Sequence, residues 1–209
     1  NGEYTFSDLL PGEYVLYAFP TDRSNVAAGY SNENGEAEMS WTNASRVVIG
    51  EETNVTGIYI VLPEVDTTSG EGMLRGVVYG DNEGMVMGKT DGGVLGSTAI
   101  TGAYVTLTDA HGVVNSYNLS GNNGAFSLDE LSAGTYTLLV DKIGFAPYTT
   151  TVIIEGSEPV TVSATLQAET TTGVEETTGN NDARVYPNPA TNGATVAFFA
   201  TPGTASVSV

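Results

Sequence analysis

One sequence pattern occurs twice in this chain at a constant separation. Residues 2–16 read Gly-x-Tyr-x-Phe-x-x-Leu-x-x-Gly-x-Tyr-x-Leu, and residues 124–138 read Gly-x-Phe-x-Leu-x-x-Leu-x-x-Gly-x-Tyr-x-Leu. Each matching residue of the second copy lies 122 positions after its counterpart (124 − 2 = 122). Repetition at a fixed spacing indicates two copies of one structural unit. The alternation of apolar residues within each copy predicts that this unit is built from β-strands.

The two copies differ in how much chain precedes the pattern. A long run of strand-like sequence leads up to Gly124, whereas a single residue precedes Gly2. We therefore expect residues 1–63 to form a partial β-sandwich that lacks its N-terminal strands, and residues 73–167 to form a complete one. Residues 64–72 are predicted to be a polar linker. In the first copy we predict a hairpin of 4–6 and 14–18 turned at 10–12, a loop at 22–43, and strands at 47–49 and 58–62.

The second copy has strand signals throughout. Short runs rich in Val, Thr, Tyr and Ile alternate with Gly, Asn and Asp turns, as is typical of sandwich domains. A Gly-rich insert at 80–100 is predicted to be a surface loop. Residues 168–182 form a Thr/Glu-rich spacer, and residues 183–209 begin a further β-rich segment with strands at 194–200 and 205–209. The predicted strands of the second copy are 74–79, 103–107, 113–119, 125–128, 135–140, 152–154 and 160–166.

The charge of the chain limits the classes of partner that it can bind. The sequence contains 25 acidic and six basic residues, which give a net charge of −19. Such a chain repels phosphate backbones and anionic lipid, so we expect no nucleic-acid binding and no electrostatic membrane binding. No apolar run reaches the length of a membrane span, so no membrane insertion is expected. Cysteine is absent, which excludes disulfides and thiol chemistry.

The second copy resembles the carboxypeptidase regulatory-like domain. The resemblance rests on Leu74-x-Gly76-x-Val78, on Ala103-x-Val105-x-Leu107 and on the repeated pattern at 124–138. It implies an Ig-like or transthyretin-like β-sandwich. The bare alternation is consistent with this, since inward-facing apolar residues must be covered by a second sheet. We therefore expect an all-β chain of tandem sandwich modules with a β-rich C-terminal tail.

The C-terminal segment resembles the start of a type A sorting domain of the type IX secretion system of Bacteroidota. The resemblance rests on Tyr186, Pro187, Asn188 and Pro189, which follow the Thr-rich spacer. This resemblance implies a secreted, cell-surface protein that is recognised by the secretion machinery. The alternative reading is an ordinary proline-rich turn that opens a third β module.

The residues give little support for catalysis. The single histidine, His111, lies in a predicted Asp-Gly turn, and a zinc site needs about three protein ligands. We expect neither a catalytic set nor a cofactor. Asp81, Glu83 and Asp91 flank or lie in the Gly-rich insert and could supply oxygen ligands for calcium. The favoured interpretation is that they are solvated loop carboxylates, because surface charge normally stays hydrated.

Two further features concern surface ligands. Thr67 follows Asp66 in the linker and resembles a Bacteroidota O-glycosylation site. Tyr30 and Trp41 lie in the predicted loop of the first copy and could stack on a sugar. The alternative is that Trp41 fastens this loop onto a sandwich.

These features lead to two functional hypotheses. The first is a non-catalytic structural segment of a secreted bacterial surface protein, such as a stalk, adhesin or filament subunit. In its sharper form, the C-terminal strands of one copy complete the partial N-terminal module of the next, head to tail. The second is an accessory module that binds or positions carbohydrate for a secreted hydrolase.

Overall fold

The computed structural model describes residues 3–20, 25–50, 54–66, 69–81 and 97–169, together with the backbone of two strands at 183–186 and 195–198. These residues form β-strands joined by turns, with a single 3-10 turn, so the all-β prediction is confirmed. The chain divides into two compact units, residues 1–169 and 170–209. The division falls inside the predicted spacer 168–182.

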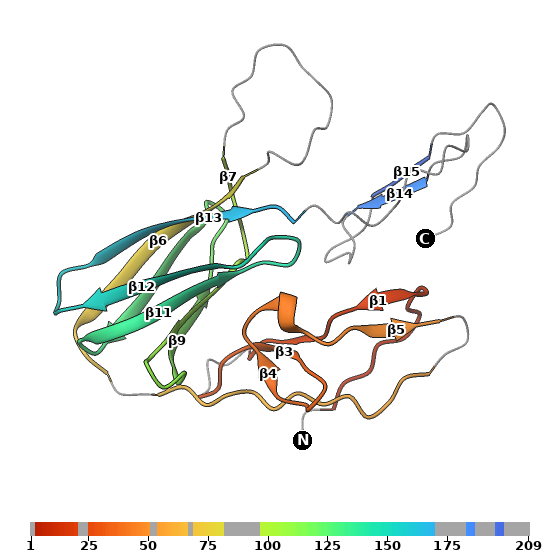
Figure 1. Cartoon of the computed structure of the whole chain (residues 1–209), viewed down its shortest axis with the longest axis horizontal. Helices are drawn as coiled ribbons and strands as arrows, with labels where there is room; N and C mark the ends of the chain where they lie inside the picture. The colour runs from red at the N-terminus through yellow and green to blue at the C-terminus, as the bar shows by residue number, and fades with distance from the viewer. Residues whose placement is uncertain are drawn as a thin grey trace, which may run out of the picture. The chain divides into compact units, whose positions relative to one another are not determined.

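A β-sandwich forms the main body of the first unit (Figure 1). One sheet has the order β10-β6-β13, with the short β7 added beside β6, and the other has the order β12-β11-β8-β9. All seven strands predicted for the second copy are present. Their bounds are β6 Gly72–Asp81, β7 Thr98–Ala99, β8 Tyr104–Thr108, β9 Val114–Leu119, β10 Ala125–Leu131, β11 Gly134–Asp141, β12 Tyr148–Ile154 and β13 Val160–Gln167.

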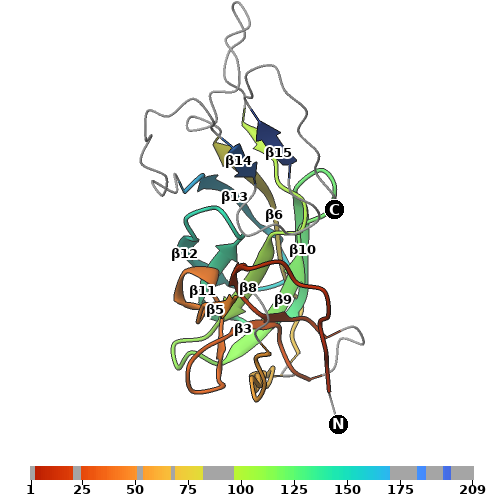
Figure 2. The ribbon, with the colours of Figure 1, turned by 90° about the vertical axis from the view of Figure 1, so that its right-hand side faces the viewer.

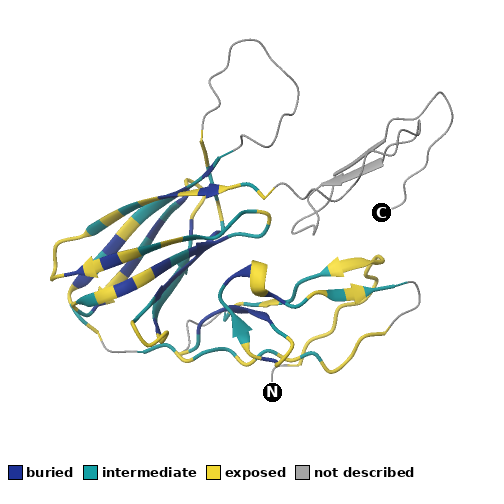
Figure 3. Cartoon of the chain, in the orientation of Figure 1, coloured by how far each residue is buried: buried dark blue, intermediate teal, exposed yellow. Residues whose placement is uncertain are grey.

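The core of the sandwich consists of alternate residues from both sheets. Strand β6 is central, because it pairs antiparallel with β10 and parallel with β13. Its inward-facing Leu74 and Val78 are fully buried, whereas Arg75 between them is exposed. Figure 3 shows a similar alternation along β12 and β13, whereas β8 is buried on both faces. The pleat of a strand thus turns the alternating sequence into a two-faced sheet.

The first copy forms a smaller set of strands that packs against this sandwich. Strand β1 pairs antiparallel with β5, and β2, β3 and β4 form a second small sheet. The 3-10 turn η1 lies between β4 and β5. Figure 1 and Figure 2 both show the part of this set around β3 next to the sheet that contains β9 and β11. The bounds are β1 Gly12–Tyr14, β2 Tyr17–Ala18, β3 Gly29–Ser31, β4 Ala37–Glu38, η1 Trp41–Asn43 and β5 Val47–Ile49.

The backbone and side chains of the two copies agree in detail. Asp8 and Glu130, 122 positions apart, are the two described residues other than glycine with positive φ, at 58° and 59°. The Tyr14 hydroxyl donates to the Leu10 carbonyl at 2.7 Å, and the Tyr136 hydroxyl donates to the Ser132 carbonyl at 2.9 Å. The sequence repeat is therefore also a repeat of local structure.

Two predicted strands of the first copy do not form. Residues 4–6 belong to no strand, so the predicted hairpin at 4–18 is wrong, and β1 pairs with β5 instead. Residues 58–62 contain no strand beyond an isolated bridge between Glu36 and Val61. Their counterparts in the second copy are β10 and β13, which both pair with β6. The described residues of the first copy provide no strand equivalent to β6, so neither segment has the ladder that forms β10 and β13.

Three other predicted boundaries differ from the structure. The predicted loop at 22–43 contains β3, β4 and η1. In the predicted linker 64–72, Val65 bridges Val114, the Asp66 amide donates to the Val114 carbonyl at 2.7 Å, and β6 begins at Gly72. In the predicted insert 80–100, β6 continues to Asp81 and β7 pairs with it. The residues between them, 82–96, lie outside the described residues.

The C-terminal unit contains one described pair of strands. Strand β14 (Ala183–Tyr186) pairs antiparallel with β15 (Thr195–Phe198). Strand β15 lies within the strand predicted at 194–200. The strand predicted at 205–209 lies outside the described residues.

Candidate functional sites: a buried junction and an open groove

The structure describes only some of the residues predicted to bind calcium, to carry a glycan or to act in sorting. Asp81 ends β6, and its Oδ2 atom accepts a hydrogen bond from the Gln167 side chain at 3.4 Å. In the described part of the chain, no three potential metal-ligating side chains gather in one place. Tyr186 ends β14. The remaining predicted residues of these sites, Glu83, Asp91, Thr67, Pro187, Asn188 and Pro189, lie outside the described residues.

His111 lies in a surface turn. Its side chain is 86% exposed, and Nδ1 lies 3.5 Å from Asp109 Oδ2. The Asp109 carboxylate also accepts hydrogen bonds from the Val113 and His111 amides at 2.9 and 2.8 Å. These bonds, that from Val113 first, lower the pKa of Asp109. The pair therefore closes the turn between β8 and β9.

Tyr30 and Trp41 lie in a junction between the two copies. Each is only 4% exposed, so neither ring offers a free face on which a sugar could stack. The Trp41 indole donates a hydrogen bond to the Phe145 carbonyl at 2.7 Å. The guanidinium of Arg46 lies over the same ring, 5.1 Å from its centroid. Trp41 thus fastens the first copy to the sandwich, as in the alternative reading of its sequence context.

Asp141 is the polar centre of this junction. It ends β11 and faces away from the sandwich core, because its neighbour Val140 faces inward. Its carboxylate accepts a hydrogen bond from Ser40 Oγ at 2.8 Å, and the Trp41 amide lies 3.3 Å from both oxygens. The Tyr30 hydroxyl also bonds to it. The carboxylate has no exposed surface.

Burial raises the pKa of Asp141 despite these hydrogen bonds. Loss of hydration is the largest effect, and the bonds from Ser40, Trp41 and Tyr30 oppose it. Burial also raises the pKa of Tyr30, with a further contribution from the Asp141 charge. A carboxylate held by three groups of the other copy makes the docking geometry specific, since an unpaired buried charge would be strongly unfavourable.

An aromatic cluster extends the junction across the outer face of β8 and β9. Tyr17 of the first copy lies 4.6 Å from Tyr30 and 5.9 Å from Tyr104, centroid to centroid. Phe19 meets Tyr117 edge to face at 6.0 Å. The Tyr104 hydroxyl donates to the Ala28 carbonyl at 3.0 Å. Burial of these rings supplies the apolar part of the contact.

Sequence reasoning did not identify Asp141 or Tyr104. A signal was present, because Asp141 extends the alternating strand 134–140 with a charged residue at the position where a strand ends. The corresponding residue of the first copy is Phe19, so the repeat did not mark this position as acidic. The contacts of Asp141 lie 100 and 101 residues away in sequence, and no local pattern reports such a separation.

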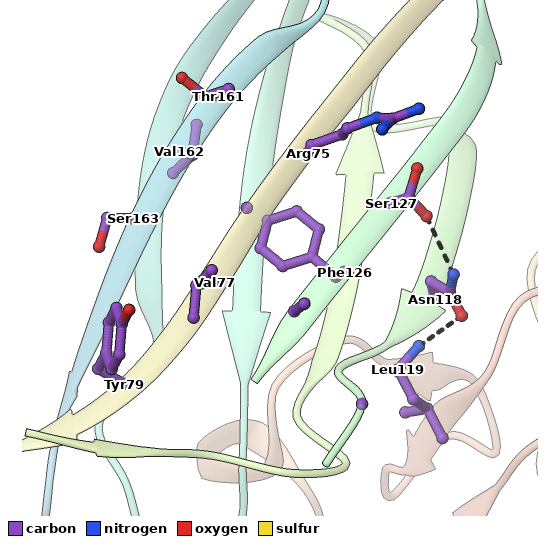
Figure 4. A pocket seen from close by; sticks show the side chains of 13 residues that line it. Arg75, Val77, Tyr79, Asn118, Leu119, Phe126, Ser127, Thr161, Val162 and Ser163 are labelled. Carbon is purple, nitrogen blue, oxygen red and sulfur yellow. Dashed lines mark hydrogen bonds between the residues drawn. The ribbon is translucent and has the colours of Figure 1, made fainter. Parts of the chain in front are cut away.

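An open groove lies along the outer face of the β10-β6-β13 sheet (Figure 4). Its volume is about 920 Å³. Arg75, Val77 and Tyr79 line it from β6, and Thr161 and Ser163 line it from β13. At the opposite border the Asn118 side chain donates to the Ser127 carbonyl at 3.0 Å. Phe126 and Ser127 line it from β10. The groove therefore combines two aromatic rings, one guanidinium and several hydroxyl groups.

A protein-family comparison matches part of the sandwich. Residues 91–167 match the carboxypeptidase regulatory-like domain, so this part of the predicted resemblance is confirmed. The match does not extend to residues 183–209, where the sorting domain is predicted. No curated protein matches the chain.

Solved structures resemble the chain loosely. A candidate carbohydrate-binding protein of Pseudomonas aeruginosa is 18% identical, with a TM-score of 0.35, covering 47% of this chain and 90% of that one. A minor pilin of Streptococcus agalactiae is 18% identical, with a TM-score of 0.37 and coverages of 81% and 66%. The major pilin subunit BcpA of Bacillus cereus is 13% identical, with a TM-score of 0.34 and coverages of 68% and 37%. Similarity at this level does not establish a shared function.

The described residues include no helix long and apolar enough to cross a membrane.

Proposed function

We propose that the chain is a non-catalytic structural segment of a secreted bacterial surface protein, in which tandem β modules are locked into one rigid body. The observation that carries this proposal is the junction at Asp141. A flexible tether between independent modules needs no buried contact, whereas here a carboxylate, an indole and an aromatic cluster are committed to it. A rigid connection of this kind suits a stalk or filament, whose task is to hold a fixed geometry.

The location and the assembly route belong to the same proposal. The Tyr-Pro-Asn-Pro element at 186–189 supports a sorting role for the C-terminal segment, and it is the one observation that does so. Head-to-tail assembly would have the C-terminal strands of one copy complete the first module of another. For β15 this requires release from β14, with which it pairs in the structure.

The rigid junction can be tested with the natural fluorescence of the protein. The chain has one tryptophan, and it lies in the junction, so its emission reports undocking while circular dichroism reports loss of the strands. We expect the two thermal transitions to coincide in the wild type. Asp141→Ala should separate them, because it leaves Ser40 and the Trp41 amide without their partner, at a cost of about 1–3 kcal/mol. Ile153→Ser, at an exposed position of the same sandwich, is the matched control.

Separate transitions in the wild type would show that the copies are loosely joined and would contradict the proposal. The proposed location of the protein on the cell surface is tested independently, with antibodies against residues 72–169. Labelling of intact cells of the source organism is expected, and labelling confined to permeabilised cells would refute the surface assignment.

A second candidate function is carbohydrate binding in the groove. Tyr79 and Arg75 point to this alternative, because a ring and a guanidinium beside hydroxyl groups are a common combination for sugar recognition. Glycan-array binding by the wild type, lost on Tyr79→Ala and retained on Tyr148→Ala, would favour it. Absence of binding to any glycan would count against it.

A further inference from the structure

Two Asn-Gly turns, at residues 32–36 and 121–125, share one backbone geometry. In each turn the amide of the first residue donates to the carbonyl of the fifth, and the amide of the fourth donates to the carbonyl of the first. These bonds are 3.2 Å long in the first turn and 2.8 Å long in the second. The fourth residue is a glycine with positive φ, 77° at Gly35 and 74° at Gly124. The third residue is an exposed asparagine in both turns, so the two are a matched pair.

The two turns differ in what holds the side chain of that asparagine. Asn123 Oδ1 accepts a hydrogen bond from the Ala125 amide at 3.1 Å. In the first turn the equivalent amide, that of Glu36, donates instead to Asn32 Oδ1 at 2.9 Å. The Asn34 side chain therefore makes no hydrogen bond with any residue that the structure describes.

The first residue of each turn causes this difference. Asn32 has a side chain that reaches the amide of the fifth residue. Gly121 has no side chain, so the amide of the fifth residue is left for Asn123. A third turn of this geometry, at residues 109–113, follows the first, because Asp109 Oδ1 accepts the equivalent amide there. An Asp or Asn side chain at the first position thus takes the amide that would otherwise hold the third residue.

An unrestrained asparagine side chain before glycine can react with its own backbone. The glycine nitrogen gives its proton to a solvent base and attacks the asparagine Cγ atom. A C–N bond forms, the Cγ–Nδ2 bond breaks, and the amide group takes a proton from water and leaves as ammonia. Water then opens the resulting succinimide at either of its carbonyls, which gives aspartate or isoaspartate. Glycine favours the reaction because it has no side chain to obstruct the attack.

We propose that Asn34 is a site of spontaneous deamidation, because Asn32 takes the amide that would otherwise hold the Asn34 side chain. Asn123 must break its bond to the Ala125 amide before its side chain can turn toward the next residue, which should make it about three- to tenfold slower. The Gly35 amide also holds its proton in a longer and weaker hydrogen bond than its counterpart does. This inference goes beyond the structural role and does not depend on it.

The reaction changes the hairpin that leads to the junction between the copies. The turn joins β3 to β4, Tyr30 lies in β3, and Ser40 follows β4. The hydroxyls of both residues bond to Asp141. Deamidation places a further negative charge between Glu33 and Glu36, and isoaspartate also lengthens the backbone within the turn. We therefore expect the modified hairpin to hold the junction less firmly.

Peptide mapping of the full chain measures the two sites separately. Trypsin cuts after Arg and Lys, so it places Asn34 in the peptide 24–46 and Asn123 in the peptide 90–142. The chain is aged in warm, mildly alkaline buffer, and mass spectrometry follows the conversion of each amide to an acid. In the folded chain we expect Asn34 to react about three- to tenfold faster than Asn123. In denaturant, where both turns are lost, the two rates should become similar.

Exchange of the first residue between the turns tests the cause. Asn32→Gly should slow the reaction of Asn34 by about three- to tenfold, since the amide of the fifth residue becomes available to its side chain. Gly121→Asn should accelerate the reaction of Asn123, and there is room for it, because an added Cβ would lie 3.6 Å from the nearest atom. If Asn32 only stiffened the turn, the opposite would occur, because its removal would loosen the turn and speed the reaction of Asn34.

Glu33→Gln is the matched control, since it changes the second residue of the turn, and the Asn34 rate should stay within about twofold of the wild type. Equal rates at Asn34 and Asn123 in the folded chain would overturn the proposal, as would an unchanged or faster reaction of Asn34 in Asn32→Gly. The deamidated chain, separated by its additional negative charge, should show the Trp41 fluorescence transition at a lower temperature than the fresh chain. An unchanged transition would refute the effect on the junction.

Discussion

Asp141 shows how one residue can define the relation between two modules. Its carboxylate is buried and accepts hydrogen bonds from the side chain of Ser40 and the backbone of Trp41. A hydrophobic residue in its place could pack against the first copy in several orientations. A buried acceptor needs its donors in defined positions, because an unsatisfied polar group in the interior is costly.

The raised pKa of Asp141 predicts a pH dependence of stability. The folded protein binds a proton at this carboxyl more tightly than the unfolded chain, whose ordinary value is 3.8. Above that pH and up to the raised pKa, unfolding releases a proton, so this group lowers the stability as pH rises. We expect the melting temperature of the wild type to fall relative to that of Asp141→Asn as the pH rises from the ordinary value of 3.8 towards the raised pKa.

Asp109 provides a control for which the pH dependence of stability has the opposite sign. Hydrogen bonds lower its pKa, so its contribution to stability is present above the ordinary pKa and is lost as pH falls. The wild type should therefore gain stability relative to Asp109→Asn as pH rises. A difference between wild type and Asp141→Asn that is constant across the range would contradict the prediction.

At the scale of elements, β6 explains why the two copies differ. Strands β10 and β13 form in the second copy because β6 gives each of them a ladder of backbone hydrogen bonds. Segments 3–9 and 54–62 have similar sequences but no such ladder. Strand propensity describes how well a residue fits a pleated, half-buried surface, and it does not replace the neighbouring strand.

A substitution within β6 tests its packing. Gly76→Ala should destabilise the sandwich by about 1–3 kcal/mol, because the added methyl group meets the Phe126 ring and the Val162 carbonyl. Chemical denaturation measures the loss. Gly156→Ala is the matched control, since nothing lies within 4 Å of the added carbon there. An equally stable Gly76→Ala protein would show that β6 and β10 can separate without penalty.

At the scale of the whole molecule, the excess of acidic residues opposes folding. A net charge of −19 produces self-repulsion that is strongest in the compact state. Raising the salt concentration from about 20 mM to 300 mM shortens the range of this repulsion severalfold. We expect the melting temperature to rise by a few degrees, as scanning calorimetry would measure. A melting temperature that falls with salt would show that attractive ion pairs outweigh the repulsion.

Much of the second copy could be predicted from its sequence. Its strands are visible because each pairs with at least one neighbour within the same module, so alternation, turn residues and pairing all agree. The same reasoning failed for residues 4–6 and 58–62, where the local signal is equally clear. It also did not find β3 and β4, whose short runs lie among Gly, Asn and Glu residues and are held by contacts with the sandwich.

The repeat by itself determined the fold class, the inward and outward faces of the second copy, and the correspondence of residues 2–16 with residues 124–138. Those features depend on residues close in sequence or on strict alternation. The tertiary structure alone decided that Trp41 and Tyr30 are buried and that Asp141 joins the copies. Each of these depends on contacts between segments distant in sequence, whose free energy is absent from any local pattern.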